Sequence, residues 1–303
     1  MIEAMLYRKK SGDDGGVVRG TFTPKAASSV GHGGHAIALI DNKIYAYGGS
    51  NASLNTIMEM YDIATDKWTA VAPVGSPPAG RHNAAHCVLN NKLYLFSGCT
   101  AIGWTGWTNE AWVYDFATKV WSRIANTPVT QGLMTAVPIN GKIYLYGGFQ
   151  GAGGLNTFLE YDPSNNTYRS IAHSMGGRYG HRCLAINNKM YVIAGHDSSG
   201  PVLSTLCYDP SNNTWETLPN IPTATRHPYA GAIGDYIYVY GGYTGSAASV
   251  KLWKYNIVTK VWTGLPDGTL NTYLGCTVTT PDGVWAHGGS TDTAVFNNLT
   301  KIS

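Results

Sequence analysis

Six apolar runs, each containing tyrosine or tryptophan and each ending at glycine, recur along the chain at nearly constant spacing. They read IYAYGG, LYLFSG, IYLYGG, YVIAG, IYVYGG and VWAHGG, and their final glycines are Gly49, Gly98, Gly148, Gly195, Gly242 and Gly289. The steps between these glycines are 49, 50, 47, 47 and 47 residues. A repeat of this length is typical of a β-propeller blade.

Three further features keep the same register. An aromatic residue stands four positions before each final glycine: Tyr45, Tyr94, Tyr144, Tyr191, Tyr238 and Trp285. A two-residue turn stands about seven positions before each final glycine, and its residues tolerate the positive φ of type I′ hairpins. These turns are Asp41–Asn42, Asn90–Asn91, Asn140–Gly141, Asn187–Asn188, Gly234–Asp235 and Asp282–Gly283. Five repeats then carry a tyrosine with an aromatic residue seven positions later: Tyr61 and Trp68, Tyr114 and Trp121, Tyr161 and Tyr168, Tyr208 and Trp215, Tyr255 and Trp262.

These markers predict four short antiparallel strands in each repeat. The inner strand, for example 36–40, is small and apolar because it lines a crowded axis. The Tyr and Trp of the outer strands fill the space between twisted sheets, where burial stabilises by roughly 25 cal/mol per Å². Because a lone blade cannot bury both of its faces, the repeats must close into a ring.

The double glycine followed by tyrosine and then tryptophan resembles the kelch-repeat family over residues 17–303. The resemblance implies an all-β, six-bladed kelch-type β-propeller, in which ligands meet the face made by the loops after the glycines and the loops entering the inner strands. It does not choose an activity, since kelch propellers serve as adaptors, actin binders, oxidases and isomerases.

The two ends of the chain predict how the ring closes. The last repeat has a third strand at 294–300 but no fourth, and residues 17–23 precede the first inner strand, so we expect 17–23 to complete the sixth blade. The expected blades are 30–73, 79–128, 131–173, 178–222, 226–269 and 270–303. Residues 1–16 form an N-terminal arm outside the ring, interpreted either as a disordered leader or as a contact in a larger assembly.

Composition excludes several classes of function. The net charge of +3 gives no basic footprint for nucleic acid, and no segment is apolar enough for a signal peptide or a membrane span. We therefore expect synthesis in the cytoplasm, with incorporation into a virion or other particle left open. Charged residues make up only 13% of the chain, which fits either an outward-facing polar surface or simply many tight turns. The five cysteines include no CxxC pair, so we expect no metal site, and we expect Cys87, Cys183 and Cys276, which lie in apolar runs, to be small core residues.

The resemblance implies which side chains lie on the binding face. Directly after the glycines come Ser50, Cys99, Phe149, His196, Tyr243 and Ser290. Arg81, Arg178 and Arg226 match the family's arginine before the inner strand, whereas the other three repeats carry His32, Gln131 or Gly132, and Thr272. Two interpretations of these arginines stay open: contact with a ligand, or bonds to loop carbonyls of the adjacent blade. We interpret His82, His181 and His227 beside them as polar loop residues.

The second repeat contains a longer loop, CTAIGWTGWTNEAW, with Trp104 and Trp107 among glycine and threonine. Flat aromatic rings beside small polar groups suit stacking on a sugar or anchoring a protein partner. The alternative is that the loop folds back and Trp104 covers the neighbouring blade.

Carboxylates near this face are few, with only Glu110 and Asp197 close to it, and general acid–base catalysis needs a close tuned pair. We therefore favour a non-enzymatic, cofactor-free binding or scaffolding module with a protein partner. One alternative is a surface component of a phage tail or similar particle, held through the arm and recognising a glycan or receptor. The other is a sugar-active isomerase using His196, Asp197 and Arg178.

Overall fold

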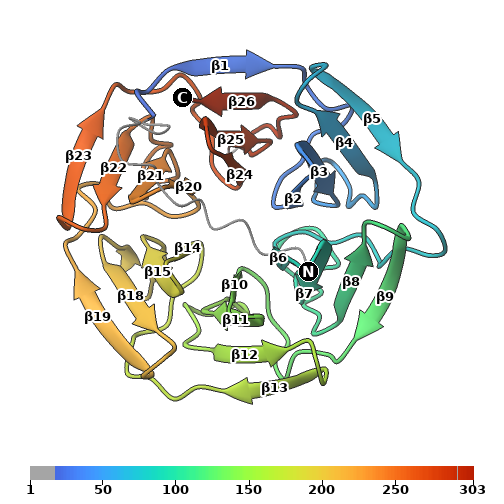
Figure 1. Ribbon diagram of the computed structural model, residues 1–303, viewed down its shortest axis with the longest axis horizontal. Coiled ribbons are helices and arrows are strands. Elements are labelled where there is room, and N and C mark those ends of the chain that lie inside the picture. The colour runs from blue at the N-terminus through green and yellow to red at the C-terminus, as the bar shows by residue number, and fades with distance from the viewer. Residues whose placement is uncertain (1–17, 292) are drawn as a thin grey trace.

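The computed structural model describes residues 18–291 and 293–303 and shows six four-stranded antiparallel sheets arranged around one axis (Figure 1). All regular structure in these residues is β-strand, as the repeat pattern predicts. The described residues contain no helix able to cross a membrane. The expected arm, residues 1–16, lies outside the described residues.

The first five blades each use strands in sequence order from the axis outward. Blade 1 has β2 (Ala36–Ile40), β3 (Lys43–Tyr47), β4 (Met58–Asp62) and β5 (Lys67–Val71); blade 2 has β6 (Ala85–Leu89), β7 (Lys92–Phe96), β8 (Ala111–Asp115) and β9 (Val120–Ile124); blade 3 has β10 (Thr135–Ile139), β11 (Lys142–Tyr146), β12 (Phe158–Asp162) and β13 (Thr167–Ser170). Blade 4 has β14 (Arg182–Ile186), β15 (Lys189–Ile193), β18 (Thr205–Asp209) and β19 (Thr214–Leu218), and blade 5 has β20 (Tyr229–Ile233), β21 (Tyr236–Tyr240), β22 (Leu252–Asn256) and β23 (Val261–Leu265).

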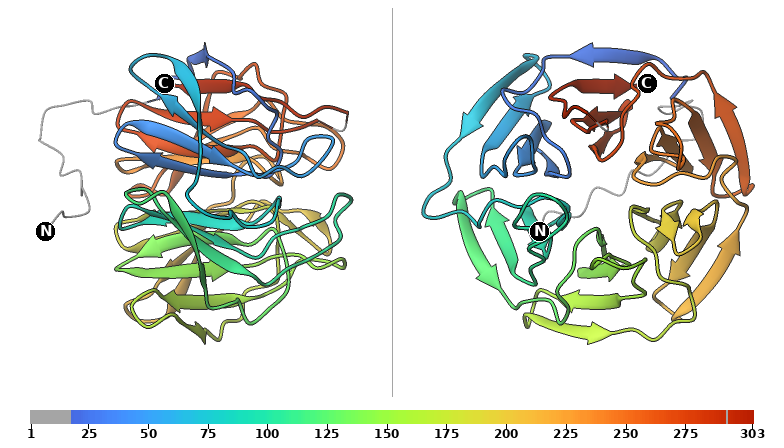
Figure 2. Two further views of the ribbon diagram at one scale, coloured as in Figure 1. Left: turned by 90° about the vertical axis from the view of Figure 1, so that its right-hand side faces the viewer. Right: turned by 180° about the vertical axis from the view of Figure 1, so that it is seen from behind.

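Blade 6 is built from both ends of the chain. It has β24 (Cys276–Thr280), β25 (Gly283–His287) and β26 (Leu299–Ile302), with β1 (Phe22–Lys25) as its outermost strand. A two-stranded ladder, β16 (His196–Asp197) and β17 (Gly200–Pro201), lies in the loop after the glycine of blade 4. Loops project from the ring at both ends of the axis (Figure 2).

The closing strand confirms the predicted ring, but its position differs from the expected 17–23. Phe22 pairs with Ile302 and Lys25 with Leu299, and Thr21 and Ser303 exchange two further backbone hydrogen bonds. Val18 precedes the strand as a buried residue whose N–H donates to the hydroxyl of Tyr238. The third strand begins at Leu299 and not at 294, because Val295 instead bridges back to Ser290 within the preceding loop.

Four of the six inner hairpins have the predicted turn, with positive φ at both central residues: Asp41–Asn42, Asn90–Asn91, Asn140–Gly141 and Asn187–Asn188. Blade 5 has positive φ only at Gly234. In blade 6 the turn is Pro281–Asp282, one residue earlier than expected, and neither residue has positive φ. Proline fixes φ near −65°, so this turn cannot be type I′.

The outer aromatic residues pair across strands as predicted and join the blades. In five blades the ring centroids of the Tyr and its partner lie 4.8–5.3 Å apart. Further ring contacts cross between blades, for example Tyr47 of blade 1 with Trp121 of blade 2 at 4.7 Å and Tyr146 of blade 3 with Trp215 of blade 4 at 5.4 Å. The hydrophobic core is therefore a series of aromatic layers between adjacent sheets.

The final glycines are required by crowding as well as by conformation. Gly49 has φ +85°, and a Cβ there would lie 2.9 Å from His35 Cβ. Gly195 has φ +107°, and its Cβ would lie 2.8 Å from His181 Cβ. A side chain at either position would collide with the residue that precedes the inner strand of the same blade.

Around the axis, the blades are joined by a backbone ring that the sequence did not reveal. Six residues with positive φ form it, and we call it the axial amide ring: Gly34, Asn83, Leu133, Gly180, His227 and Leu274. Each of five N–H groups donates to the carbonyl of the member in the preceding blade, for example Asn83 to Gly34 at 2.7 Å and Leu133 to Asn83 at 2.9 Å. Because these bonds link separate blades, they fix the distance of each inner strand from the axis.

The seam between blades 1 and 6 contains a buried histidine network. His287 Nδ1 lies 3.0 Å from His35 Nε2, and His287 Nε2 lies 3.0 Å from the hydroxyl of Ser28, just after the closing strand. Burial, and then the charge of His32, lower the pKa of His287 to about 3. Burial also lowers the pKa of His35, with His287 and His32 adding to the shift. Both imidazoles are therefore neutral in the folded protein at neutral pH.

We predict that a chain beginning at residue 27 unfolds about 10 °C below a chain beginning at residue 18. The shorter chain loses Val18 and Phe22 from the core of the last blade, together with four strand pairs. Thermal unfolding followed by far-UV circular dichroism measures the difference. Equal midpoints would contradict a closing role for β1.

We predict that stability falls as pH decreases from about 6.5. Histidines with lowered pKa values stay neutral when folded and take up protons only on unfolding, so each contributes up to about 1.4 kcal/mol of stability loss per pH unit. Urea unfolding between pH 7.5 and pH 4.5 measures the slope. In His287→Gln the slope should decrease by about one such increment, and an unchanged slope would contradict this assignment.

Candidate binding face

The loops after the six final glycines and the loops entering the inner strands form one end of the propeller, which we call the glycine face. In every blade one residue from each loop meets in a two-residue antiparallel bridge: Gly33 with Ser50, His82 with Cys99, Gly132 with Phe149, Tyr179 with His196, Arg226 with Tyr243, and Tyr273 with Ser290. Each bridge pairs the residue that follows a final glycine with the residue that stands sixteen positions before that glycine. The side chains at these positions therefore contribute to the chemistry of the face.

Arg81 and Arg178 lie one residue before the bridge and are buried, with exposed fractions of 2% and 7%. Arg81 Nη1 donates to Ser97 O at 3.3 Å, and Arg178 Nη1 donates to Ala194 O at 3.2 Å. The equivalent residues of other blades bond the carbonyl at the same position: His32 to Gly48, Gln131 to Gly147 and Thr225 to Gly241. These different side chains therefore have the same structural role, which is to bond the carbonyl of the residue before the final glycine.

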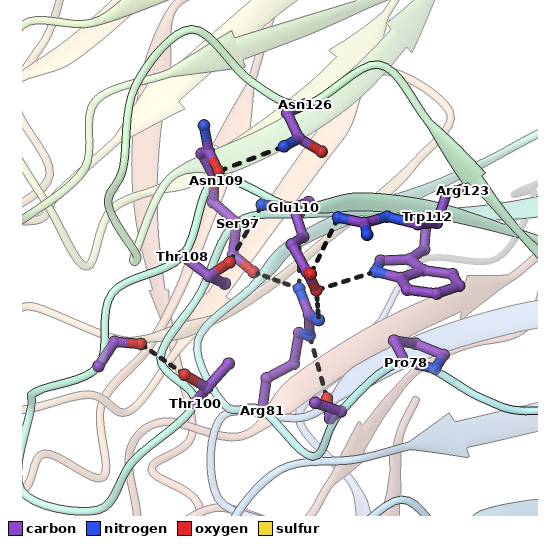
Figure 3. Close-up of polar contacts among 12 residues, drawn as sticks. Pro78, Arg81, Ser97, Thr100, Thr108, Asn109, Glu110, Trp112, Arg123 and Asn126 are labelled. Atoms are coloured by element: carbon purple, nitrogen blue, oxygen red, sulfur yellow. Dashed lines mark hydrogen bonds and ion pairs between the residues drawn. The ribbon is translucent and has the colours of Figure 1, made fainter.

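Arg81 also binds a carboxylate (Figure 3). Its Nη2 donates to Glu110 Oε2 at 2.8 Å, and its Nε donates to Ala79 O at 3.2 Å. Glu110 receives further bonds from Arg123 Nη2 at 2.9 Å and Trp112 Nε1 at 3.3 Å. The hydrogen bond from Arg81 lowers the pKa of Glu110. These contacts assign the Glu110 carboxylate to holding the loop before the inner strand.

Arg226 does not share the position of the other two arginines, which corrects the alignment expected from sequence. It stands sixteen residues before its glycine, whereas Arg81 and Arg178 stand seventeen before theirs, and Thr225 takes the bonding position in blade 5. Arg226 is partly exposed on the glycine face, with its guanidinium carbon 5.0 Å from the centroid of the Tyr243 ring. Its Nη1 lies 3.4 Å from the hydroxyl of Tyr179.

Two groups of partly exposed rings, linked by an arginine, cross the glycine face, and we call them together the aromatic arc. Ring centroids are 5.6 Å apart for Trp107 and Phe149, 4.7 Å for Phe149 and Tyr179, and 5.0 Å for Tyr179 and His196. Arg226 links this part to the next, where Tyr243 and Tyr273 lie 5.3 Å apart. The arc runs from blade 2 to blade 6 and contains these residues: Trp107, Phe149, Tyr179, His196, Arg226, Tyr243 and Tyr273.

Sequence reasoning did not identify Tyr179 and Tyr273. Both stand sixteen residues before a final glycine, as Arg226 does. Counting that interval separately from the seventeen-residue interval of Arg81 would have found them, because the bridge pairs this position with the residue after the glycine.

The two loop tryptophans have different environments. Trp107 packs on blade 3, where its ring lies so close to Gly132 that a Cβ there would be 2.7 Å from it. Trp104 is 40% exposed, has φ +62°, and its ring lies edge-on to His82 at 5.9 Å. The loop thus folds back through Trp107, whereas Trp104 remains accessible.

Small residues interrupt the arc at blade 1. Gly33 and Ser50 form the bridge there, and a cavity of about 170 Å³ borders Ser50, Trp104, His82, Ser290, Val295 and Leu274. A partner lying along the aromatic arc therefore has room for one side chain beside Trp104.

The arc carries one positive charge, on Arg226. Burial, and then the charge of Arg226, lower the pKa of His196, so this imidazole stays neutral at neutral pH. Burial by itself would raise the pKa of Asp197. The hydrogen bonds that Ser199 donates to its carboxylate have the larger combined effect, so the pKa of Asp197 is lowered. Asp197 is thus an ionised carboxylate bonded within its own loop.

The described residues, 18–291 and 293–303, contain no group of three or more His, Cys, Asp or Glu side chains placed to hold a metal ion. His82, His181 and His227 lie in the loops that enter the inner strands, and their side chains are buried. His181 Nε2, for example, lies 2.8 Å from the Thr135 hydroxyl of blade 3. All five cysteines are free thiols.

Comparison with known proteins gives a consistent result. The KLHDC2/KLHL20/DRC7 Kelch-repeats domain matches residues 34–221 and 126–289 of the chain. Similar proteins include the Kelch-like protein terF of Aspergillus terreus, 28% identical over 46% of this chain and 31% of that protein. Human Kelch-like protein 23 is 30% identical over 48% of this chain and 25% of that protein. Bovine Kelch domain-containing protein 3 is 26% identical over 38% of this chain and 31% of that protein.

We predict that Arg81→Ala destabilises the fold far more than Arg226→Ala does. Removing Arg81 takes a hydrogen-bond donor from three loop carbonyls and from the Glu110 carboxylate, and should lower the free energy of unfolding by about 2–3 kcal/mol. Arg226→Ala should change it by less than about 0.5 kcal/mol. Arg81→Gln is the matched control, because Gln131 makes the equivalent carbonyl bond in blade 3. Urea unfolding measures all three, and equal costs for Arg81 and Arg226 would contradict their separate roles.

Proposed function

The chain belongs to the kelch-repeat family, and we propose that it is a non-catalytic binding module that holds a protein partner through the aromatic arc. The single observation that carries this proposal is the contiguity of the arc. Rings from five blades follow one another on one face in two contacting groups that Arg226 links, and each ring remains partly exposed. Exposed aromatic residues and arginine are the residue types that dominate binding energy at protein interfaces.

The arc favours a partner with particular chemistry. Its rings offer apolar surface for aromatic or aliphatic side chains, and Arg226 offers a planar cation for a carboxylate. No salt bridge among the described residues involves Arg226, so its charge is available to a partner. We therefore expect a peptide segment or loop that combines apolar residues with an acidic one.

The alternative hypotheses have less support. The kelch relatives lend none to a component of a phage tail or similar particle, or to a sugar-active isomerase. For glycan recognition, Trp104 is the exposed ring of the two loop tryptophans, whereas Trp107 packs edge-on against Phe149 and is only partly exposed. For the isomerase, Arg178 is buried on backbone carbonyls and Asp197 is bonded by Ser199.

Peptides selected from a random phage-displayed library against the wild-type protein test the proposal. Fluorescence polarisation then gives the Kd of each selected peptide for the wild type and for Phe149→Ala, Tyr179→Ala and Arg226→Ala. We predict at least about a tenfold loss of affinity for each variant, equivalent to about 1.4 kcal/mol. The loss for Arg226→Ala should be confined to peptides that contain an acidic residue.

The matched control is Val258→Ala, which changes an exposed apolar residue at the opposite end of the propeller, in the turn after β22. It should leave every Kd unchanged. The proposal is wrong if the selected peptides bind all three arc variants as tightly as the wild type, or if Val258→Ala weakens binding to the same extent.

A further inference from the structure

The inner strands enclose a cavity of about 340 Å³ on the propeller axis, lined by residues of all six blades. Figure 1 shows the strands that surround it, β2, β6, β10, β14, β20 and β24. The axial amide ring contributes to one end. This volume lies within the range of small-molecule sites, about 300–1,000 Å³. The cavity is separate from the aromatic arc, whose members do not line it.

One side chain brings a permanent charge into the cavity. Arg182, at the start of β14, reaches across the axis, where its Nε donates to Pro228 O at 2.6 Å and its Nη2 donates to Gly275 O at 2.7 Å. Arg182 thereby joins blades 4, 5 and 6. Within the described residues its Nη1 has no hydrogen-bond acceptor, and both N–H groups of that nitrogen remain for a ligand.

Among the described residues, no carboxylate balances this charge. The described residues that line the cavity include no Asp, Glu or Lys, and no salt bridge among the described residues involves Arg182. Burial lowers the pKa of the lining residue His86 to about 4, and the charge of Arg182 adds to this shift. At neutral pH the described lining residues therefore supply one cation and no anion, an arrangement that favours an anionic ligand.

Further along the inner strands from Arg182, four apolar side chains line the wall beside Thr279. Val278 and Leu184 are the third residues of their inner strands, and Leu39 and Val88 are the fourth. A strand rises about 3.3 Å per residue, so this apolar band lies roughly 7–10 Å along the axis from the first positions. The guanidinium group of Arg182 donates to the carbonyls of Pro228 and Gly275, which directly precede β20 and β24. It therefore lies near the start of the inner strands, and the apolar band lies further along them.

We propose that the axial cavity binds a small monocarboxylate with an apolar chain of about four to six carbons. Its carboxylate lies against Nη1 of Arg182, and its chain extends along the axis to Leu39, Val88, Leu184 and Val278. The unpaired cation selects the anionic head, and the distance from Arg182 to the apolar band selects the chain length. This site does not depend on the partner-binding role of the glycine face.

Isothermal titration calorimetry with hexanoate and hexanamide at neutral pH tests the proposal. We expect hexanoate to bind the wild type with a Kd of about 1 mM or tighter. The neutral amide should bind at least about tenfold more weakly, because it lacks the charge that Arg182 recognises. Acetate should bind more weakly than hexanoate because it does not reach the apolar band. Sodium chloride at equal ionic strength controls for general salt effects.

Variants assign the binding to the cavity. Arg182→Gln should lose hexanoate binding, whereas Lys67→Gln, which removes one positive charge from outer strand β5, should keep it. Should Arg182→Gln fail to fold, Ala136→Leu provides the test, because it retains Arg182 and fills the cavity from β10. The proposal is overturned if 20 mM hexanoate gives no binding heat with the wild type, if hexanamide binds equally well, or if the folded cavity variant retains wild-type affinity.

Discussion

Every blade depends on its neighbours to bury its two apolar faces. A single four-stranded sheet of this chain exposes rings on both sides, and the contacts that cover them come from adjacent blades, such as Tyr47 with Trp121 and Phe96 with Tyr168. The first and last repeats can satisfy this requirement only by meeting, as Tyr61 and Trp285 do. The ring is therefore a condition of stability for each part, and β1 completes it by covering the last outer edge.

Ring closure also determines what the residues near the axis do. Once the blades are locked, the residue seventeen positions before the final glycine bonds a backbone carbonyl in five blades, whether it is arginine, histidine, glutamine or threonine. The next residue lies on the glycine face. One step along the backbone thus separates a structural side chain from one available to a partner, as Arg178 and Tyr179 demonstrate.

The two proposed sites differ in their physical basis. The aromatic arc is broad, partly exposed and weakly charged, which suits a macromolecular partner that buries several rings at once. The axial cavity is narrow and holds an unpaired cation above an apolar wall, which suits a small anion. Arg226 and Arg182 show the contrast, since the first lies over a tyrosine ring at the surface and the second spans the axis.

The sequence by itself determined the number of blades, the order of their strands, the aromatic pairs and the use of an N-terminal strand to close the ring. These follow from local periodicity, because every blade repeats the same spacing of glycine, tyrosine and tryptophan. Only the tertiary structure decided that Arg81 and Arg178 are buried, that Trp107 folds onto Phe149, and that Arg182 reaches three blades. Those outcomes depend on distances between residues of different blades, which are set when the ring closes and leave no spacing signal within one repeat.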